Sequence, residues 1–326
     1  MRNLFFAAAL ALATPAAADV QSALDDHILP GFAAFTEASA VLAETAATEC
    51  GAEALAPAYN AAFDAWLAVA DIRIGPSETG ALSVSFWPDT KGFTRKALNR
   101  KLADQDPAAL TPERMHETSI AGRGFLALDM LLFDAAYRDQ RGYACDLAAA
   151  IAADLAVQAK ELEAAWHDGF TAVILSAGEA GNTTFLTPQE ASNAIYTQVL
   201  AGLQFVYTKR VGRPLGEMNR PRPARAEAWR SGRSVANIVG ATEAAVSLAE
   251  ALAGFELPKT QAALERVRVT AAKIEDPTFA DIKGNVEAWI KLEALGQRVQ
   301  EVQDTIMTEL GAPMGLKAGF NSQDGD

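Results

Sequence analysis

The spacing of apolar residues is helical along almost the whole chain, whereas the two-residue alternation that marks strands is nearly absent. Alanine is so frequent that long, closely packed helices are favoured. Helices of about 24 to 30 residues would be about 36 to 45 Å long, which is the length scale of helical bundles. The pattern predicts an all-α protein with a short helix over 91–103 and main helices over 20–49, 54–71, 111–134, 143–167, 187–210, 225–253, 259–275 and 279–311, the last broken near Gly296.

A glycine-rich, weakly polar stretch near residue 182 separates the main helices into two groups of four. We therefore expect two four-helix bundles packed side by side, the N-terminal bundle over 19–182 and the C-terminal bundle over 183–326. One long irregular segment interrupts each bundle, at 72–110 and at 211–224. Ordered loops of such length usually carry function or cover a core, so both segments are candidates for a site.

The first 18 residues have the pattern of an export signal. Arg2 is followed by the apolar run Leu4–Ala13, and the small residues Ala16–Ala18 come before the expected cleavage point. Cleavage after Ala18 would place the mature chain in the periplasm. The apolar run is too short to cross a bilayer, and no later stretch approaches the roughly 18 to 20 uninterrupted apolar residues that a spanning helix needs. A membrane-spanning protein is therefore not predicted.

Export also decides how the two cysteines are interpreted. Cys50 and Cys145 would lie in an oxidising compartment, where an even number of cysteines favours a disulfide over a metal-binding pair. We predict that they bond to each other. The alternative is two buried free thiols.

Charge is unevenly distributed along the chain. Lys and Arg number 28 against 41 Asp and Glu, and the formal net charge of −13 argues against a nucleic-acid partner. The segment from Lys209 to Arg233 departs from this balance, because it carries eight cations against only Glu217 and Glu227. The arginine fork suits carboxylates and phosphates. Either these arginines tie the second bundle to acidic residues of the first, or they bind an anionic ligand.

One acidic residue lies in an otherwise apolar helix. The stretch from Gly124 to Phe133 is apolar on every side except at Asp129, and a helix that is apolar all round is buried. A buried carboxylate is costly unless it is paired or hydrogen-bonded. We expect Asp129 either to meet a cation or to lie on a narrow wet seam with a structural hydrogen bond.

Several motifs together resemble the imelysin family, over essentially the whole expected mature chain. They are Ala65-Trp66 with Arg73-Ile74-Gly75-Pro76, the turn Phe86-Trp87-Pro88, the arginine-rich run from Pro221 to Ser234, and the ending from Gly319 to Asp326. The resemblance implies an all-α periplasmic or surface protein of two four-helix bundles, associated with bacterial iron uptake. The family was named as a peptidase.

The metal-binding motif proposed for that family is Gly-x-His-x-x-Glu, and the residues that match it here are Gly124, Leu126 and Asp129. Positions three apart share a helix face, so a histidine and a glutamate there could present a nitrogen and an oxygen to one metal ion. Leu126 removes the nitrogen and leaves one carboxylate. We therefore predict no metal site of this kind and no catalytic residue. The three histidines, His27, His116 and His167, are expected at the surface or at helix ends.

The expected site lies between the bundles, where Asp129 and the arginine-rich segment would meet. Its expected binding residues are Asp129, Arg73, Trp87, Arg225, Glu227, Arg230 and Arg233. Such residues favour an anionic ligand, and an iron chelate or a peptide carboxylate would fit. We expect a binding or accessory protein of iron uptake without catalysis, with iron as the candidate ligand, no other cofactor, and periplasmic or membrane proteins as candidate partners. The alternatives are a metallopeptidase with carboxylate ligands and a structural interaction module.

Overall fold

The computed structural model describes residues 18–319, and within them the chain folds into helices without strands, apart from one isolated bridge between Glu217 and Arg220. The expected all-α class is confirmed. The export signal and the ending motif after Gly319 lie outside the described residues, so both stay predictions. The longer helices are α2 (Leu29–Thr48), α3 (Ala52–Leu67), α4 (Ser77–Val84), α5 (Phe93–Asp104), α7 (Gly124–Phe133), α8 (Tyr143–Ala165), α10 (Pro188–Phe205), α12 (Ser234–Ala253), α13 (Pro258–Ala271) and α14 (Val286–Ile306).

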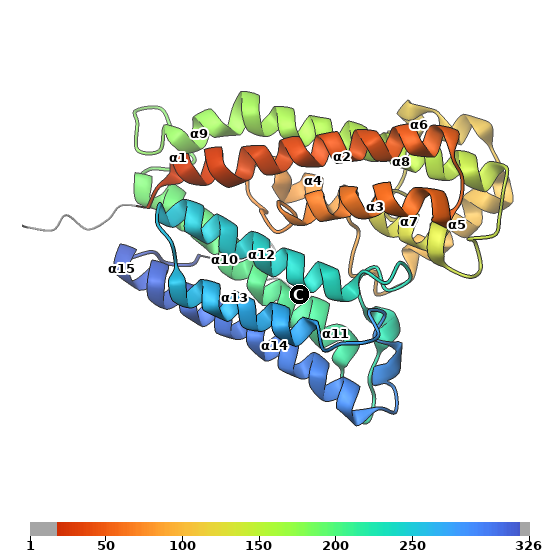
Figure 1. The fold of residues 1–326 in the computed structure, drawn as a ribbon. Coiled ribbons are helices and arrows are strands. Elements are labelled where there is room, and N and C mark those ends of the chain that lie inside the picture. Colours follow the sequence, from red (N-terminus) through yellow and green to blue (C-terminus); the bar gives the residue numbers. More distant parts are fainter. Residues whose placement is uncertain (1–17, 320–326) are drawn as a thin grey trace, which may run out of the picture.

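The helices from the first half of the chain pack around a cluster of aromatic rings. Helix α2 runs along α3 and α8, and α7 packs against α3 and α8 (Figure 1). The rings of Phe63 and Phe125 lie 4.5 Å apart between centroids, and those of Phe35 and Trp66 lie 5.0 Å apart. All four side chains are buried. Because large aromatic side chains bury the most apolar area per residue, this cluster fixes the position of α7.

The second half forms a layer inclined to the first (Figure 1). Helix α13 packs on α14, and α10 packs on α12 and α14. Helix α12 also contacts α3 and the short helix α1 (Val20–Ala23), so it joins the two layers. Among the described helices, α12 alone has the length and apolar composition of a membrane span, and here it packs within the protein. Two groups of helices agree with the expected bundles, and the boundary near residue 182 stays a prediction.

The predicted continuous helix over 111–134 is wrong. The chain forms the short α6 (Pro112–His116), one turn of 3₁₀ helix at Ile120–Gly122, and then α7. The break has a backbone cause, because Gly124 has φ +73° at the first position of α7. Only glycine adopts this conformation without steric cost.

The predicted helix over 225–253 is also wrong in its first part, since α12 begins at Ser234. Positive φ values at Ala228 (47°) and Gly232 (72°) turn residues 226–233 into an irregular loop. Conversely, the break expected near Gly296 is absent, because α14 runs through this residue. A Cβ at Gly296 would lie 3.0 Å from Val211, so the glycine permits close helix packing.

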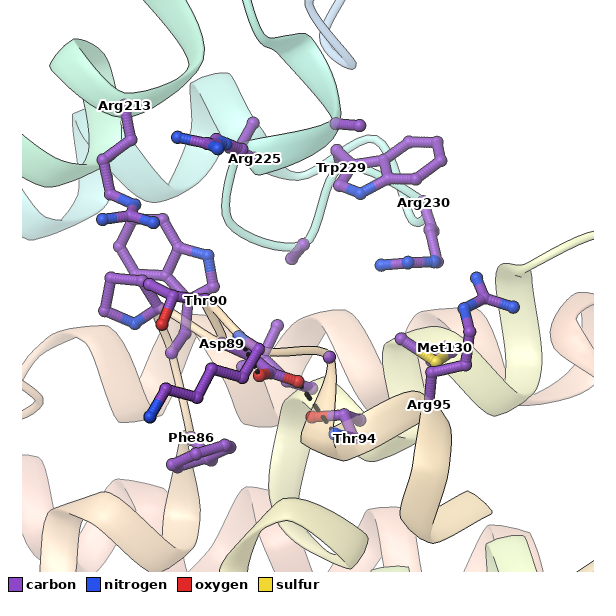
Figure 2. A pocket seen from close by; sticks show the side chains of 18 of the residues that line it. Phe86, Asp89, Thr90, Thr94, Arg95, Met130, Arg213, Arg225, Trp229 and Arg230 are labelled. Atoms are coloured by element: carbon purple, nitrogen blue, oxygen red, sulfur yellow. Dashed lines mark hydrogen bonds between the residues drawn. The ribbon is translucent and has the colours of Figure 1, made fainter. Parts of the chain in front are cut away.

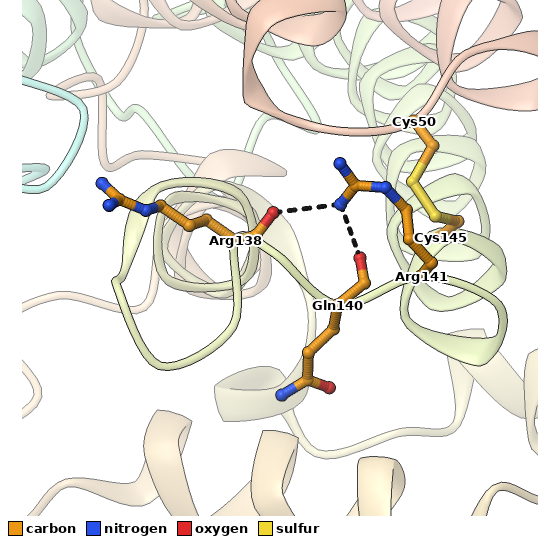
Figure 3. The surroundings of a disulfide bond; sticks show 5 residues. All are labelled: Cys50, Arg138, Gln140, Arg141 and Cys145. Carbon is orange, nitrogen blue, oxygen red and sulfur yellow. Dashed lines mark hydrogen bonds between the residues drawn. A yellow bond between two sulfur atoms is a disulfide. The ribbon is translucent and has the colours of Figure 1, made fainter.

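The predicted disulfide is confirmed. Cys50 and Cys145 are bonded, with their Cα atoms 5.5 Å apart and a sequence separation of 95. The bond joins the α2–α3 connection to the first turn of α8, as Figure 3 shows. Beside it, the Arg141 guanidinium donates to the carbonyl oxygens of Arg138 and Gln140.

Candidate functional site

A cleft of about 600 Å³ opens between the segment 86–99 and the segment 213–230, with Leu126 and Met130 of α7 in its wall. We call it the cationic cleft. Figure 2 shows Arg213, Arg225, Trp229 and Arg230 on one side, and Phe86, Asp89, Thr94 and Arg95 on the other. The two long irregular segments expected from the sequence therefore face each other here.

The cleft carries a strong excess of positive charge in a chain whose net charge is −13. Asp89 is the one acidic residue that the described part of the chain contributes to its lining. The Asp89 carboxylate accepts hydrogen bonds from the backbone N–H groups of Phe93 (3.0 Å) and Thr94 (2.8 Å), so it caps α5. Burial would raise the pKa of Asp89, but these hydrogen bonds hold it below its ordinary value. The cationic side chains are Lys91, Arg95, Lys96, Arg213, Arg225 and Arg230.

One carboxylate outside the lining links the two sides of the cleft. Asp134 accepts a 2.7 Å hydrogen bond from Arg95 of α5 and another of 2.7 Å from Arg230. Burial alone would raise the pKa of Asp134, but the hydrogen bond from the Ala136 N–H and the two arginines bring it below its ordinary value. Arg230 also lies over the Trp229 ring, 4.5 Å from its centroid.

Asp129 meets the loop 226–233 across the boundary between the two helical layers. Its Oδ1 accepts hydrogen bonds from the Ser231 hydroxyl (2.6 Å) and backbone N–H (3.1 Å). Its Oδ2 lies 3.5 Å from an Arg230 guanidinium nitrogen and receives no hydrogen bond from the described residues. The side chain is fully buried, and this burial raises the pKa of Asp129 despite Ser231 and Arg230.

Replacing Asp129 with asparagine should remove one pH-dependent contribution to stability. Because the folded pKa of Asp129 is raised, the folded state keeps a proton that the unfolded state has lost above about pH 4. As the pH rises above about 4, the free energy of unfolding of the parent should therefore fall relative to that of Asp129→Asn. The fall should be at most about 1.4 kcal/mol per pH unit, and it should end once the pH exceeds the folded pKa. Urea unfolding of both proteins between pH 4 and pH 8 measures the difference. A parallel pair of curves would contradict the prediction, and Asp139→Asn, which alters an exposed carboxylate, is the control.

The three motif positions of α7 have different surroundings. Leu126, at the position of the motif histidine, lines the cleft, and Asp129, one turn on, faces the loop 226–233. A Cβ at Gly124 would collide with the carbonyl oxygens of Ser83 and Val84 at the end of α4. The motif glycine therefore lets α7 approach α4 closely.

Arg233 does not line the cleft as expected. It is buried under the loop, where it bonds Asp64 and Asn60 of α3 and lies over the Phe63 ring. The Arg233 guanidinium is therefore bound by acidic and amide groups of the first layer.

Glu227 and Arg73 lie outside the cleft as well. Glu227 is buried and accepts 2.9 Å hydrogen bonds from Arg210 and Asn237. The Arg73 backbone N–H donates to Gln198, and its buried Nε has no partner among residues 18–319. Of the residues expected to bind, Trp87, Arg225 and Arg230 line the cleft.

Lys91, Arg95, Lys96 and Arg213 were missed as site residues. The first three belong to the basic run around the short helix expected over 91–103, and this local excess of cations was an available signal. Arg213 lies in the arginine-rich segment, but nothing local distinguishes it from Arg233 or Arg210, which are buried elsewhere.

None of the three histidines lines the cationic cleft. His116 and His167 are exposed beside Asp154 and Asp168, as expected. The expectation for His27 is wrong, because it is buried between Ser247 and the Ala68 carbonyl, and burial lowers its pKa. Within residues 18–319, no three His, Cys, Asp or Glu side chains gather closely enough to hold a metal ion.

The model of the imelysin family matches residues 28–307. The chain belongs to the imelysin family. An imelysin-like protein from Psychrobacter arcticum has a similar fold, with a TM-score of 0.73 and 18% identity over 93% of this chain and 99% of that one. A protein from Parabacteroides distasonis described as an iron-regulated protein A precursor gives a TM-score of 0.60 and 12% identity over 87% of this chain and 93% of that one. No curated protein matches significantly.

Proposed function

We propose that this imelysin-family chain is a periplasmic binding or accessory protein of iron uptake that holds an anionic ligand, such as a carboxylate chelate of iron, in the cationic cleft. The observation that carries the proposal is the charge of the lining: six cationic side chains face one carboxylate, and that carboxylate already caps α5. Arg95 and Arg230 share Asp134, and the four other cationic side chains of the lining form no ion pair with the described residues. In a chain with 41 acidic residues, such a group of unpaired cations is the feature that calls for an anion.

The size and the chemistry of the cleft support a small chelate. A volume of about 600 Å³ lies within the range of small-molecule sites. Arg213 and Arg225 form no ion pair with the described residues, so their forks can bind carboxylate oxygens in pairs. Phe86, Trp87 and Trp229 add apolar and aromatic surface.

The iron assignment is supported by the family and by the fold relative from Parabacteroides distasonis, which is described as iron-regulated. The periplasmic location is supported by the signal pattern at the N-terminus. Iron would enter the cleft as cargo, held within its chelate.

Different observations bear on the two alternatives, the structural interaction module and the metallopeptidase. Arg210 and Arg233 do join the helical layers, as the structural-module interpretation expected, but Arg213 and Arg225 do not. For the metallopeptidase, the motif positions hold Leu126 and Asp129, and the described residues offer no set of three ligands. We derive no hydrolytic step from these residues.

The proposal predicts that ferric citrate binds the mature chain with one-to-one stoichiometry, and that Lys91→Gln/Lys96→Gln weakens binding about tenfold, because each lost charge costs on the order of 0.5 to 1 kcal/mol near the surface. Isothermal titration calorimetry at low and at physiological salt would measure the affinity, which should fall with salt.

Lys259→Gln/Lys273→Gln is the matched control, because both lysines are exposed and lie outside the cleft. The proposal would be wrong if the two double variants lost the same amount of binding affinity. It would also be wrong if neither ferric citrate nor citrate bound to the parent. Metal-dependent peptide hydrolysis that is lost in Asp129→Ala would instead favour the metallopeptidase.

A further inference from the structure

A second hollow, of about 280 Å³, adjoins the cationic cleft on the side of the short helix α11 (Gly212–Leu215). We call it the outer hollow. Four arginines, two glycines and Glu217 line it, and Arg213 and Arg225 are shared with the cleft. Figure 2 shows these two shared arginines near each other on one wall of the cleft. The arginines of the outer hollow are Arg213, Arg220, Arg222 and Arg225.

The backbone is folded so that arginines separated in sequence surround one space. The Arg222 N–H donates to the Pro214 carbonyl (2.7 Å), and the Arg220 N–H donates to the Glu217 carbonyl (2.7 Å). Gly216, with φ +56°, makes the turn, and a Cβ there would lie 2.8 Å from the Arg220 carbonyl oxygen. The segment therefore doubles back on α11.

These arginines are unusual in having no acidic partner. Most arginines of the described chain form an ion pair, and Arg73 and Arg141 are the exceptions elsewhere. Among residues 18–319, the arginines without an ion pair are Arg73, Arg141, Arg213, Arg220, Arg222 and Arg225. Four of these six thus line a single hollow.

Three of the four guanidinium groups act on one another electrostatically. The Nε of Arg213 is buried and has no hydrogen-bond acceptor among the described residues. Burial lowers the pKa of Arg213, and the charges of Arg225 and Arg222 lower it further. Gathering like charges in this way costs free energy that a bound anion would offset.

From this geometry we infer that the outer hollow is a binding site for a dianionic oxyanion of the phosphate class, either free phosphate or the phosphoryl group of a larger molecule. A single carboxylate has two oxygens and is satisfied by one arginine fork, whereas a phosphate accepts hydrogen bonds on more oxygens from several directions and carries up to two charges. Arg213 and Arg225 also line the cationic cleft, whereas Arg220 and Arg222 line the outer hollow only, so the test uses the latter pair.

The test is a titration of the mature chain with inorganic phosphate and with glycerol 3-phosphate, followed by calorimetry at physiological salt. We expect one saturable site, and we expect Arg220→Gln/Arg222→Gln to weaken binding about tenfold or more. These two side chains line the outer hollow only, and neither forms a side-chain hydrogen bond or ion pair with the described residues, so their replacement breaks no contact. Binding of phosphate alone would assign the free ion, and binding of both would assign the phosphoryl group.

Three further variants make the result decisive. Arg222→Lys keeps the charge without the fork and should have an intermediate affinity. Glu217→Gln removes the one acid that the described residues place in the hollow and should tighten binding, which no loss of folding can imitate. Arg114→Gln/Arg138→Gln, with two exposed arginines elsewhere, should bind as the parent does. Equal affinity of the parent and Arg220→Gln/Arg222→Gln, or unchanged affinity in Glu217→Gln, would overturn the inference.

The outcome is separable from that of the proposed function. Lys91→Gln/Lys96→Gln changes the cationic cleft only and should leave phosphate binding unchanged, because neither lysine lines the outer hollow. If citrate fails to bind and phosphate still does, the cleft proposal fails alone.

Discussion

Replacing Arg210 with methionine should lower the free energy of unfolding by about 3 to 5 kcal/mol. Arg210 is buried between the layers, where Nε donates to Glu227 (2.9 Å) and a terminal nitrogen donates to Asp71 (2.9 Å). Burial alone would lower the pKa of Arg210, and the two carboxylates reverse that shift. Its removal deprives Asp71 and Glu227 of their direct ion-pair partner between the layers, and these partly desolvated charges account for the loss.

Urea unfolding followed by circular dichroism would measure this change. Arg268→Met is the matched control, because its ion pairs with Glu243 and Glu265 are exposed and should contribute only about 0 to 1 kcal/mol. Adding Glu227→Gln to Arg210→Met should recover part of the loss. A deficit no larger than that of Arg268→Met would refute the prediction.

Replacing Gly124 with alanine should cost about 3 kcal/mol or more. Part of the cost is conformational, because φ is +73° and this backbone geometry costs an L-residue with a side chain about 1 to 2 kcal/mol. The rest is steric, because the new Cβ would collide with the carbonyl oxygens of Ser83 and Val84, and overpacking typically costs about 1 to 3 kcal/mol. Either α7 or α4 must move.

Gly142→Ala separates the two contributions. Gly142 has φ +60° at the start of α8, but no heavy atom lies within 4 Å of a Cβ placed there. It should therefore lose only the conformational part, which is about 1 to 3 kcal/mol for the pair φ +60° and ψ −123°. Since α7 also carries Leu126 and Met130 of the cationic cleft, Gly124→Ala should in addition weaken ferric citrate binding, and Gly142→Ala should not. Equal losses of stability in the two variants would show that the carbonyl contacts contribute nothing.

The candidate site was predicted only in part, and the arginine-rich segment shows why. Its sequence marks an excess of guanidinium groups but not which of them find acidic partners. Arg210 and Arg233 are neutralised by Asp71, Glu227 and Asp64, residues up to 169 positions away. The arginines that remain without partners, and the lysines of the segment 86–99 that face them, are known only once the layers are packed.

Asp129 illustrates a different limit. Its apolar neighbours predict burial, and the requirement that a buried carboxylate be satisfied predicts a partner, without naming one. The partner is Ser231, in a stretch expected to be helical. Helical periodicity there was misleading because positive φ values at Ala228 and Gly232 bend the chain into a loop, which bonds to Asp129 of α7 and Asn60 of α3.

The sequence by itself determined the helical class, the approximate positions of most long helices, the disulfide and the family, because apolar periodicity, cysteine number and motif residues are local properties of the chain. Tertiary structure alone decided where the helices break, which arginines are neutralised, and that segments 86–99 and 213–230 enclose one cationic space. The physical reason is that a charge or a backbone bend is stabilised or penalised by atoms that the fold brings from elsewhere in the chain, and their identity is not contained in any local pattern.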